Sequence, residues 1–252
     1  MSERVSLDAL YSHKASRFIC WPEPSTDLIA ERMEELRLLG VKAIFLTGRH
    51  TIEGIPVLGK GHTGLVLEAE TRDGNLALKA RRMDADRPSM EEEARLLKLA
   101  NHVGVGPEII KWSRNFLLME LISGVYLRDW IRELRAKETK DLKKVLRAVV
   151  DQARRLDEAG VDHGELVRLR RHIMLRRGKP VFIDFESAST LRRPANVTTV
   201  IQSFFLNSKI SSIIDGQMGL PDRIKLLDKL HAYKREMNLE CYTSLLEAAQ
   251  LI

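Results

Sequence analysis

GKGHTGLVLEAETRDGNLALK, residues 59–79, is the segment from which the fold can be predicted most directly. Its glycine-rich beginning lies between two apolar segments, and the Asp73-Gly74 pair precedes a third. Asp-Gly between two strand-forming segments is a strong signal for a β-hairpin, because both residues tolerate the positive φ angles of a tight turn. Residues 55–82 therefore predict an antiparallel β-meander: strand, glycine turn, strand, Asp-Gly turn, strand.

The segments before the meander contain one helix and one strand. Apolar residues recur at helical spacing over residues 27–39, and Gly40 is well placed to end that helix. Residues 42–48, KAIFLTG, predict a short buried strand. Residues 1–24 show no strong period.

The segments after the meander complete the β-rich half of the chain. Residues 88–104 predict a helix that begins with a capping box of Ser89 and Glu92. Residues 107–121 predict two further strands joined by a turn.

After Gly124 the chain becomes mainly helical. Apolar residues at helical spacing predict a helix over residues 139–159, ended by Gly160. Residues 172–187 predict a short hairpin, and helices follow from residue 197, one of them with Pro221 at its start. The predicted fold class is therefore α+β, with a β-rich half followed by a helical half.

The composition describes an ordinary soluble globular protein. The 252 residues are 44% hydrophobic and 30% charged, and no apolar run reaches the length of about 18 residues that spans a bilayer. The first residues lack the apolar stretch of a secretory signal, and the two cysteines are too far apart to suggest a zinc site or a disulfide framework. We therefore expect a cytoplasmic protein without membrane insertion. The net charge of +6 fits either a polyanionic partner or a solvated basic surface, and both interpretations stay open.

The glycines of the first turn suggest a phosphate site. Gly59, Gly61 and Gly64, followed by Val66, would let the backbone approach a phosphate group that bulkier residues would exclude. The alternative is a tight hairpin that needs glycine for its positive φ angles. Because this motif joins two strands and not a strand and a helix, it argues against a Rossmann site.

Lys79 and Glu93 form the second chemical signal. In the meander, Lys79 lies on the same sheet face as Ala77, beneath the glycine turn, where an ammonium group can pair with phosphate oxygens. Of the carboxylates at the start of the following helix, Glu93 lies on the apolar face of the helix, whereas Glu91 lies on the solvent-exposed face. We therefore choose Glu93 as the partner of Lys79.

Four motifs in this order, GKGHTGLV, LALK, LLMELISG and FIDFE, support a resemblance to a known family. The chain resembles the eukaryotic-type protein kinase fold in its small, atypical archaeal form. It is similar to RIO-type kinases and to the small kinase of the KEOPS complex. It is more similar to archaeal proteins described as predicted serine/threonine protein kinases. The likeness covers residues 54–190.

The resemblance implies a two-lobed kinase-like fold that binds ATP and Mg2+. Residues 51–122 would form the first lobe and residues 123–252 a reduced second lobe without a long activation segment, while residues 1–50 would extend the first lobe by a helix and a strand. The implied nucleotide-binding residues are Gly59, Gly61, Gly64, Val66, Ala77, Lys79, Glu93, Met119 as gatekeeper, and Glu120 and Ile122 through their backbone. Asp184 would bind magnesium.

The sequence departs from the family at HGELVRLRRH, residues 163–172. Glu165 stands where the catalytic Asp is usual, and Arg170 stands where an Asn binds the second metal ion. Aligning the following strand instead puts His172 at the metal position, although a neutral imidazole is a poor ligand for Mg2+. His172 therefore contacts a phosphate or is a structural histidine; both alternatives stay open.

The arginines of this loop, Arg168, Arg170 and Arg171, allow three interpretations: an anionic substrate site, stabilisation of the transition state, or a solvated basic turn. His62, at the tip of the glycine turn, is expected to be exposed. No A-P-E segment follows Asp184, so a protein substrate would be docked by shape, or the substrate would not be a peptide.

We therefore expect an ATP-dependent serine/threonine protein kinase of atypical type, with Lys79, Glu165 and Asp184 as catalytic residues. One alternative is a nucleotide-binding pseudokinase or scaffold. Another is a protein associated with RNA or ribosome maturation. The expected partners are ATP, a protein or other anionic substrate, and an RNA or ribosomal partner.

Overall fold

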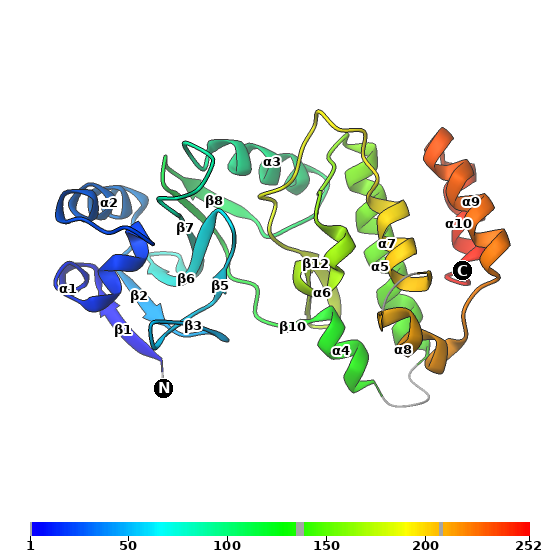
Figure 1. Ribbon diagram of the computed structural model, residues 1–252, viewed down its shortest axis with the longest axis horizontal. Helices are drawn as coiled ribbons and strands as arrows, with labels where there is room; N and C mark the ends of the chain where they lie inside the picture. Colours follow the sequence, from blue (N-terminus) through cyan, green and yellow to red (C-terminus); the bar gives the residue numbers. More distant parts are fainter. Residues whose placement is uncertain (1, 135–138, 207–208) are drawn as a thin grey trace. The chain divides into compact units, whose positions relative to one another are not determined.

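The computed structural model describes residues 2–134, 139–206 and 209–252, which form two compact units (Figure 1). The first unit comprises Met1–Lys98 and Pro107–Leu121, and the second comprises Leu99–Gly106 and Ile122–Ile252. An antiparallel sheet dominates the first unit and helices dominate the second, which confirms the α+β class.

The sheet of the first unit is antiparallel throughout and has the strand order β1-β2-β6-β7-β9-β8, with β5 also pairing with β6. Its strands are β1 (Glu3–Ser6), β2 (Ala43–Leu46), β5 (Gly59–Lys60), β6 (Gly64–Thr71), β7 (Gly74–Arg81), β8 (Ile109–Trp112) and β9 (Phe116–Glu120). A separate hairpin is formed by β3 (His50–Ile52) and β4 (Ile55–Val57). The second and third strands of the predicted meander and the strands on both sides of it are confirmed. The first predicted strand is divided, because Ile55–Val57 pair with β3 and only Gly59–Lys60 pair with β6.

One face of this sheet is covered by the N-terminal segments (Figure 1). These are the helix α1 (Leu7–Leu10), the 3₁₀ helix η1 (Lys14–Cys20) and the helix α2 (Thr26–Leu39). Because side chains alternate along a strand, the apolar residues of β6 and β7 that join this core leave Val66, Ala77 and Lys79 on the opposite face.

Residues 1–24 are more regular than their sequence predicts. β1 pairs with β2 along its whole length, from Glu3 opposite Leu46 to Ser6 opposite Ala43. This strand gains its hydrogen bonds from a partner that is distant in the sequence, so no local period could reveal it.

The helices of the first unit begin and end close to where the sequence predicts. α2 ends at Gly40, whose φ of 85° is the left-handed conformation that glycine favours. The helix α3 spans Glu91–His102, but the predicted capping box is wrong. The Ser89 hydroxyl accepts a hydrogen bond from the Glu91 N–H, and the Glu92 carboxylate pairs with Arg95 instead of reaching back.

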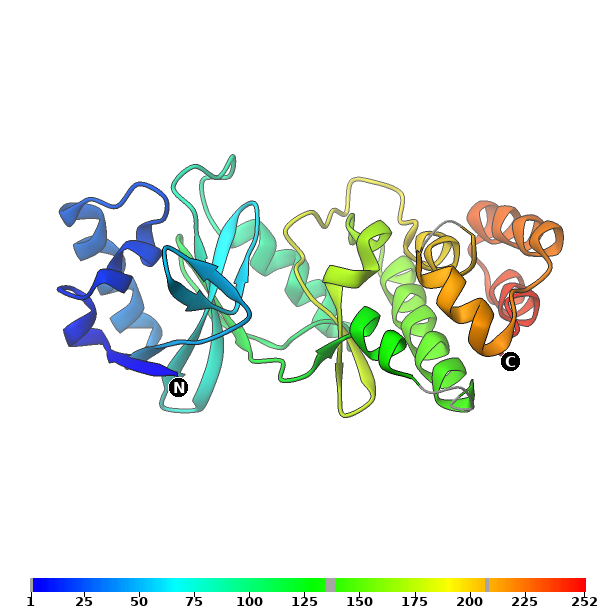
Figure 2. The same cartoon turned by 60° about the horizontal axis from the view of Figure 1, so that its bottom comes forward.

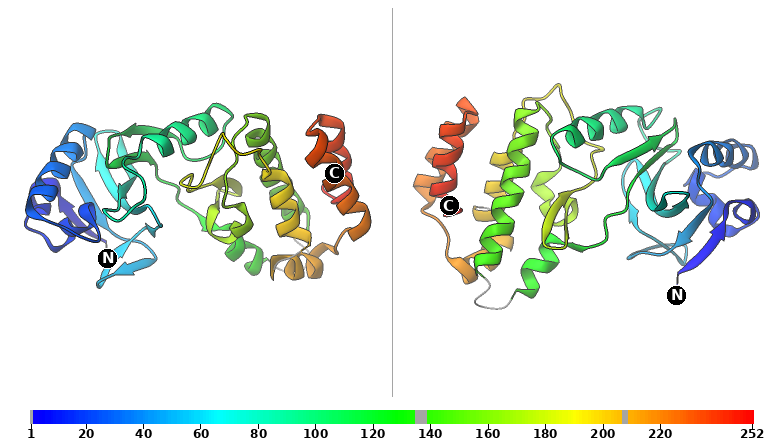
Figure 3. Two further views of the ribbon diagram at one scale, coloured as in Figure 1. Left: turned by 45° about the horizontal axis from the view of Figure 1, so that its top comes forward. Right: turned by 180° about the vertical axis from the view of Figure 1, so that it is seen from behind.

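The second unit consists mainly of helices, together with a small sheet. Its helices are α4 (Leu127–Glu133), α5 (Thr139–Glu158), α6 (Leu169–His172), α7 (Asn196–Phe205), α8 (Lys209–Met218), α9 (Arg223–Glu236) and α10 (Leu239–Ala248), and Leu166–Arg168 form the 3₁₀ helix η2. The predicted hairpin is confirmed as β11 (Ile173–Arg176) and β12 (Lys179–Phe182), and β10 (Val125–Tyr126) adds an unpredicted third strand. This small sheet contacts α4, α5 and α6. Figures 2 and 3 show α5 beside α7 and the α9–α10 pair.

Two helices of this unit differ in how well the sequence predicts their ends. α5 ends at Glu158, and Gly160 follows with a φ of 70°, as predicted. The prediction that Pro221 starts a helix is wrong, because α9 begins two residues later, at Arg223. Asp222 caps α9 by accepting a hydrogen bond from the Lys225 N–H. Among the helices that the structure describes, none combines the length and the apolar character that a membrane crossing requires.

Candidate functional site

Gly59, Val66 and Lys79 lie in one cross-strand row, on the face of the first sheet opposite the N-terminal helices. Gly59 is paired with Val66, and Val66 with Lys79. The Gly61 N–H donates to the Gly64 carbonyl over 2.8 Å and closes the turn. A Cβ atom on Gly64 would lie 2.9 Å from both the Ala80 carbonyl oxygen and Cγ of Lys79. The turn therefore needs glycine at position 64 for the close approach of the Lys79 side chain.

Lys79 and Glu93 form the predicted ion pair. The Lys79 Nζ lies 2.7 Å from Glu93 Oε1, and each side chain is only 3% exposed. Arg87 Nη1 lies 3.6 Å from the other carboxylate oxygen of Glu93. Loss of one member of a buried pair leaves an uncompensated charge and typically costs about 3–5 kcal/mol of stability. The pair therefore fixes α3 to β7 and holds the ammonium group beneath the glycine turn.

The residues expected near adenine follow the same sheet. Ala77 is buried and pairs with Met119 on β9. The Glu120 N–H donates to the Glu108 carbonyl over 2.8 Å, and Ile122 begins the second unit. Contact of these residues with a nucleotide stays a prediction.

In the second unit, the loop around Glu165 is joined to the segment after Asp184. Asp162 and Ser189 form an antiparallel bridge, with N–H···O distances of 2.9 and 2.8 Å. Between them, Gly164 has a φ of 83°, and a Cβ atom there would lie 2.4 Å from the Ser187 carbonyl oxygen. Glycine is thus required at position 164, and the loop is fixed against residues 187–189.

Glu165 is half-buried, and both of its carboxylate oxygens have neighbours. Oε1 accepts a hydrogen bond from the Ser187 hydroxyl over 3.1 Å. Oε2 lies 3.6 Å from Arg168 Nη1 and 3.8 Å from His172 Nε2. These contacts hold the longer Glu side chain in one place, which a proton acceptor requires.

His172 lies between Glu165 and Asp184. Its Nδ1 is 3.8 Å from Asp184 Oδ2, and its ring stacks edge-on against His163, with centroids 5.9 Å apart. Burial lowers the pKa of His172 in spite of the carboxylates of Asp184, Glu165 and Glu186, and burial together with His172 lowers the pKa of His163 to about 4. Both imidazoles are therefore neutral near pH 7.

Asp184 has the donor chemistry for a magnesium ion, and His172 does not. Mg2+ is usually bound by one or two carboxylates together with phosphate oxygens and water, and the Asp184 carboxylate is partly exposed. The φ of Asp184 is 68°, a conformation that is uncommon outside glycine and that clusters at functional sites. Within the described residues, no three His, Cys, Asp or Glu side chains are arranged to hold a metal ion by themselves.

Two residues after Asp184, Ser187 and Arg192, also contact this loop and were not predicted from the sequence. Ser187 binds Glu165, and the Arg192 guanidinium binds the Ser187 carbonyl over 2.5 Å and Asp162 Oδ2 over 2.9 Å. No motif marks them, because they meet these partners only when the segment after Asp184 folds back.

The remaining predicted features are at the surface. Arg168 and Arg171 are exposed, and His62 is exposed as expected. The side chain of Arg170 lies outside the described part of the chain.

Comparison with known proteins identifies one family. A family model described as the RIO domain matches residues 68–203, which is just over half of the chain. The match includes Lys79, Glu93, Glu165, His172 and Asp184. A search of curated proteins finds no significant match.

Proposed function

The chain belongs to the RIO domain family of atypical, ATP-binding, kinase-like proteins, and from this we propose a specific reaction for it. The protein transfers the γ-phosphoryl group of ATP to a serine or threonine hydroxyl of a protein substrate. The observation that carries this proposal is the buried Lys79–Glu93 ion pair directly beneath the glycine turn. An ammonium group that a buried carboxylate holds next to the glycine turn is suited to phosphate oxygens.

Each unit contributes its own residues to the proposed reaction. In the first, the glycine turn of residues 59–64 covers the phosphates, Lys79 pairs with them, and Ala77, Met119, Glu120 and Ile122 are proposed for adenine. In the second, Glu165 accepts the proton of the substrate hydroxyl and Asp184 binds magnesium. Magnesium, if bound there, would neutralise negative charge on the phosphate groups. The burial of His172 supports a structural role, in which it keeps the two carboxylates apart and oriented.

The nucleotide site is tested by the variant Lys79→Ala. Mg·ATP should raise the melting temperature of the unaltered protein, because a ligand that binds only the folded state stabilises it. We expect this increase to disappear in Lys79→Ala. Lys42→Ala, which removes an exposed lysine of the same unit, should keep the full increase. Equal stabilisation of both variants by Mg·ATP would exclude Lys79 from phosphate binding.

The proposed base is tested by Glu165→Gln. The amide cannot accept the proton, so phosphate transfer should fall at least about 100-fold, while stabilisation by Mg·ATP is kept. The control Glu240→Gln removes an exposed carboxylate of α10 and should leave the rate unchanged. Transfer by Glu165→Gln at the rate of the unaltered protein would show that Glu165 is not the base. Autophosphorylation and phosphate release, measured together, separate a kinase from an ATPase.

A pseudokinase is the second candidate, and one observation favours it. No Asn follows Glu165 in the loop to bind a second metal ion. Stabilisation by Mg·ATP without any phosphate transfer would select this candidate. An RNA or ribosomal partner and a cytoplasmic location stay predictions; the slope of RNA affinity against salt concentration measures how many phosphates are contacted.

A further inference from the structure

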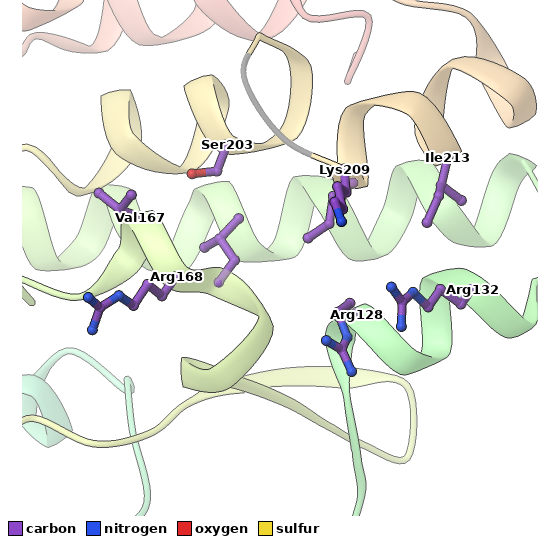
Figure 4. Close-up of a pocket in the computed structure, with 9 residues that line it drawn as sticks. Arg128, Arg132, Val167, Arg168, Ser203, Lys209 and Ile213 are labelled. Atoms are coloured by element: carbon purple, nitrogen blue, oxygen red, sulfur yellow. The ribbon is translucent and has the colours of Figure 1, made fainter. Parts of the chain in front are cut away.

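The second unit contains a basic pocket next to the loop of Glu165, with a volume of 310 Å³ (Figure 4). Four cationic residues line it: Arg128 and Arg132 of α4, Arg168 of η2, and Lys209 at the start of α8. Figure 4 shows the two arginines of α4 on one side of the pocket and Lys209 on the other. We name it the α4–α8 pocket.

The positive charge of the α4–α8 pocket is only partly balanced. Of the described residues that line it, none is acidic. Arg128 pairs with the neighbouring Asp129 over 3.0 Å, and Arg168 lies 3.6 Å from Glu165. Arg132 and Lys209 are exposed and have no acidic partner within residues 2–134, 139–206 and 209–252. Like charges around one concave site repel one another and attract an anion.

The rest of the lining is aliphatic. It consists of Val167, Leu169, Ile210 and Ile213, together with Ser203. Val167 is 76% exposed, although the leucines on either side of it in the loop, Leu166 and Leu169, are buried. Aliphatic side chains offer no flat surface on which bases can stack, which single-stranded nucleic acids use for binding. A peptide that carries an anionic group beside an aliphatic side chain matches both parts of the lining.

We propose that the α4–α8 pocket binds an anionic segment of the protein substrate, a phosphoserine or a Glu beside an aliphatic residue. This inference rests on the proposed kinase function and names its substrate class. Arg168 connects the pocket to the proposed base, because it lines the pocket and its guanidinium faces the Glu165 carboxylate. The pocket also takes over a role that a longer activation segment serves in larger kinases, where that segment holds the peptide.

The test is a binding experiment with the full chain. Fluorescence anisotropy measures three labelled peptides that share one aliphatic sequence and differ at a single position: phosphoserine, Glu or Ser. The pocket variant Arg132→Glu/Lys209→Glu reverses the two cations that have no acidic partner among the described residues. The control Arg223→Glu/Lys225→Glu makes the same change of charge on two exposed cations of α9. Circular dichroism establishes that both variants are folded.

We expect the phosphoserine or the Glu peptide to bind at least about tenfold more tightly than the Ser peptide. The pocket variant should lose this difference and the control should keep it. A preference for phosphoserine alone identifies a phosphate monoester as the anionic group, and an equal preference for Glu identifies an acidic segment. Equal binding of all three peptides, or equal losses in the pocket variant and the control, would overturn the proposal.

Two further measurements distinguish peptide binding from RNA binding and from the function of the nucleotide site. A single-stranded RNA that binds more tightly than the peptides, and loses binding in the pocket variant, would replace the peptide by a nucleic acid. Stabilisation by Mg·ATP is measured in parallel and depends on Lys79, which belongs to the other unit. Failure of the nucleotide site together with intact peptide binding refutes the kinase proposal alone. Stabilisation by Mg·ATP together with the loss of selective peptide binding refutes only the proposed role of the α4–α8 pocket.

Discussion

His163 is the most completely enclosed titratable residue of the candidate loop. Its side chain has no exposed surface, its ring packs against Phe182, Phe185 and His172, and its Nε2 lies 3.2 Å from the Ile183 carbonyl oxygen. Its backbone N–H donates to Asn196 Oδ1 over 2.9 Å. Through these contacts His163 joins the loop of Glu165 to β12, to the segment of Asp184 and to α7.

The burial of His163 predicts how stability changes with pH. Its pKa is lowered from the ordinary 6.5 to about 4, so the unfolded chain takes up a proton between these values that the folded chain does not. The free energy of unfolding should therefore fall as the pH falls from 6.5 to 4, by up to about 3 kcal/mol. His172, whose pKa is also lowered, contributes in the same direction.

Urea unfolding at several pH values tests this prediction. The variant His163→Gln should show a clearly smaller slope of unfolding free energy against pH than the unaltered protein, whatever its absolute stability. The control His231→Gln replaces an exposed histidine and should keep the slope. An unchanged slope in His163→Gln would mean that this imidazole takes up its proton over the same pH range in the folded and the unfolded protein.

At the scale of elements, α2 is fixed to the first sheet by two charged residues. The guanidinium of Arg32, which is 2% exposed, donates to the carbonyls of Ile19 and Arg81 and to Asn115 Oδ1. One turn later, Glu35 accepts hydrogen bonds from Ser113 and from the backbone and side chain of Asn115. The sequence contained a sign of this arrangement, since Arg32 stands three residues after Ile29 and four before Leu36, on the apolar face.

The anchoring role of α2 predicts a large effect for Arg32→Met. Methionine fills similar space but removes the donor of the Ile19 and Arg81 carbonyls, whereas Asn115 Oδ1 keeps its hydrogen bonds from Arg81. The change should cost about 3 kcal/mol of unfolding free energy or more. Chemical denaturation of the full chain measures this loss. Arg37→Met is the matched control on the same helix, because Arg37 is exposed and its pair with Glu34 is worth less than about 1 kcal/mol. Equal stability of the two variants would show that the Arg32 contacts add nothing.

At the scale of the whole molecule, the proposed chemistry is divided between two units. The first contains the glycine turn and the Lys79–Glu93 pair, and the second contains Glu165, His172, Asp184 and the α4–α8 pocket. The residues of the first unit are held in place by the core of the first sheet. Those of the second unit are held in place by the contacts of His163 and Arg192. A change in one group should therefore leave the geometry of the other intact, and the tests of Lys79 and of Glu165 rely on this independence.

Local patterns in the sequence were enough to predict the β-meander, the positions of most helices, and the pairing of Lys79 with Glu93. The patterns are the turn residues, the alternation along strands, and the helical spacing that puts Glu93 on the apolar face. The family model matches residues 68–203, a range that contains three of the four motifs and begins just after the glycine motif of residues 59–66.

The strand within residues 1–24, the hydrogen-bond partners of Arg32 and the surroundings of Glu165 depend on tertiary contacts. β1 depends on β2, Glu165 on Ser187, and the α4–α8 pocket on residues of α4, η2, α7 and α8 that are far apart in the sequence. No local period records such contacts, because they form only after the chain has folded back on itself. The sequence therefore specifies which chemical groups are present, and the packing of distant segments determines which of these groups come into contact.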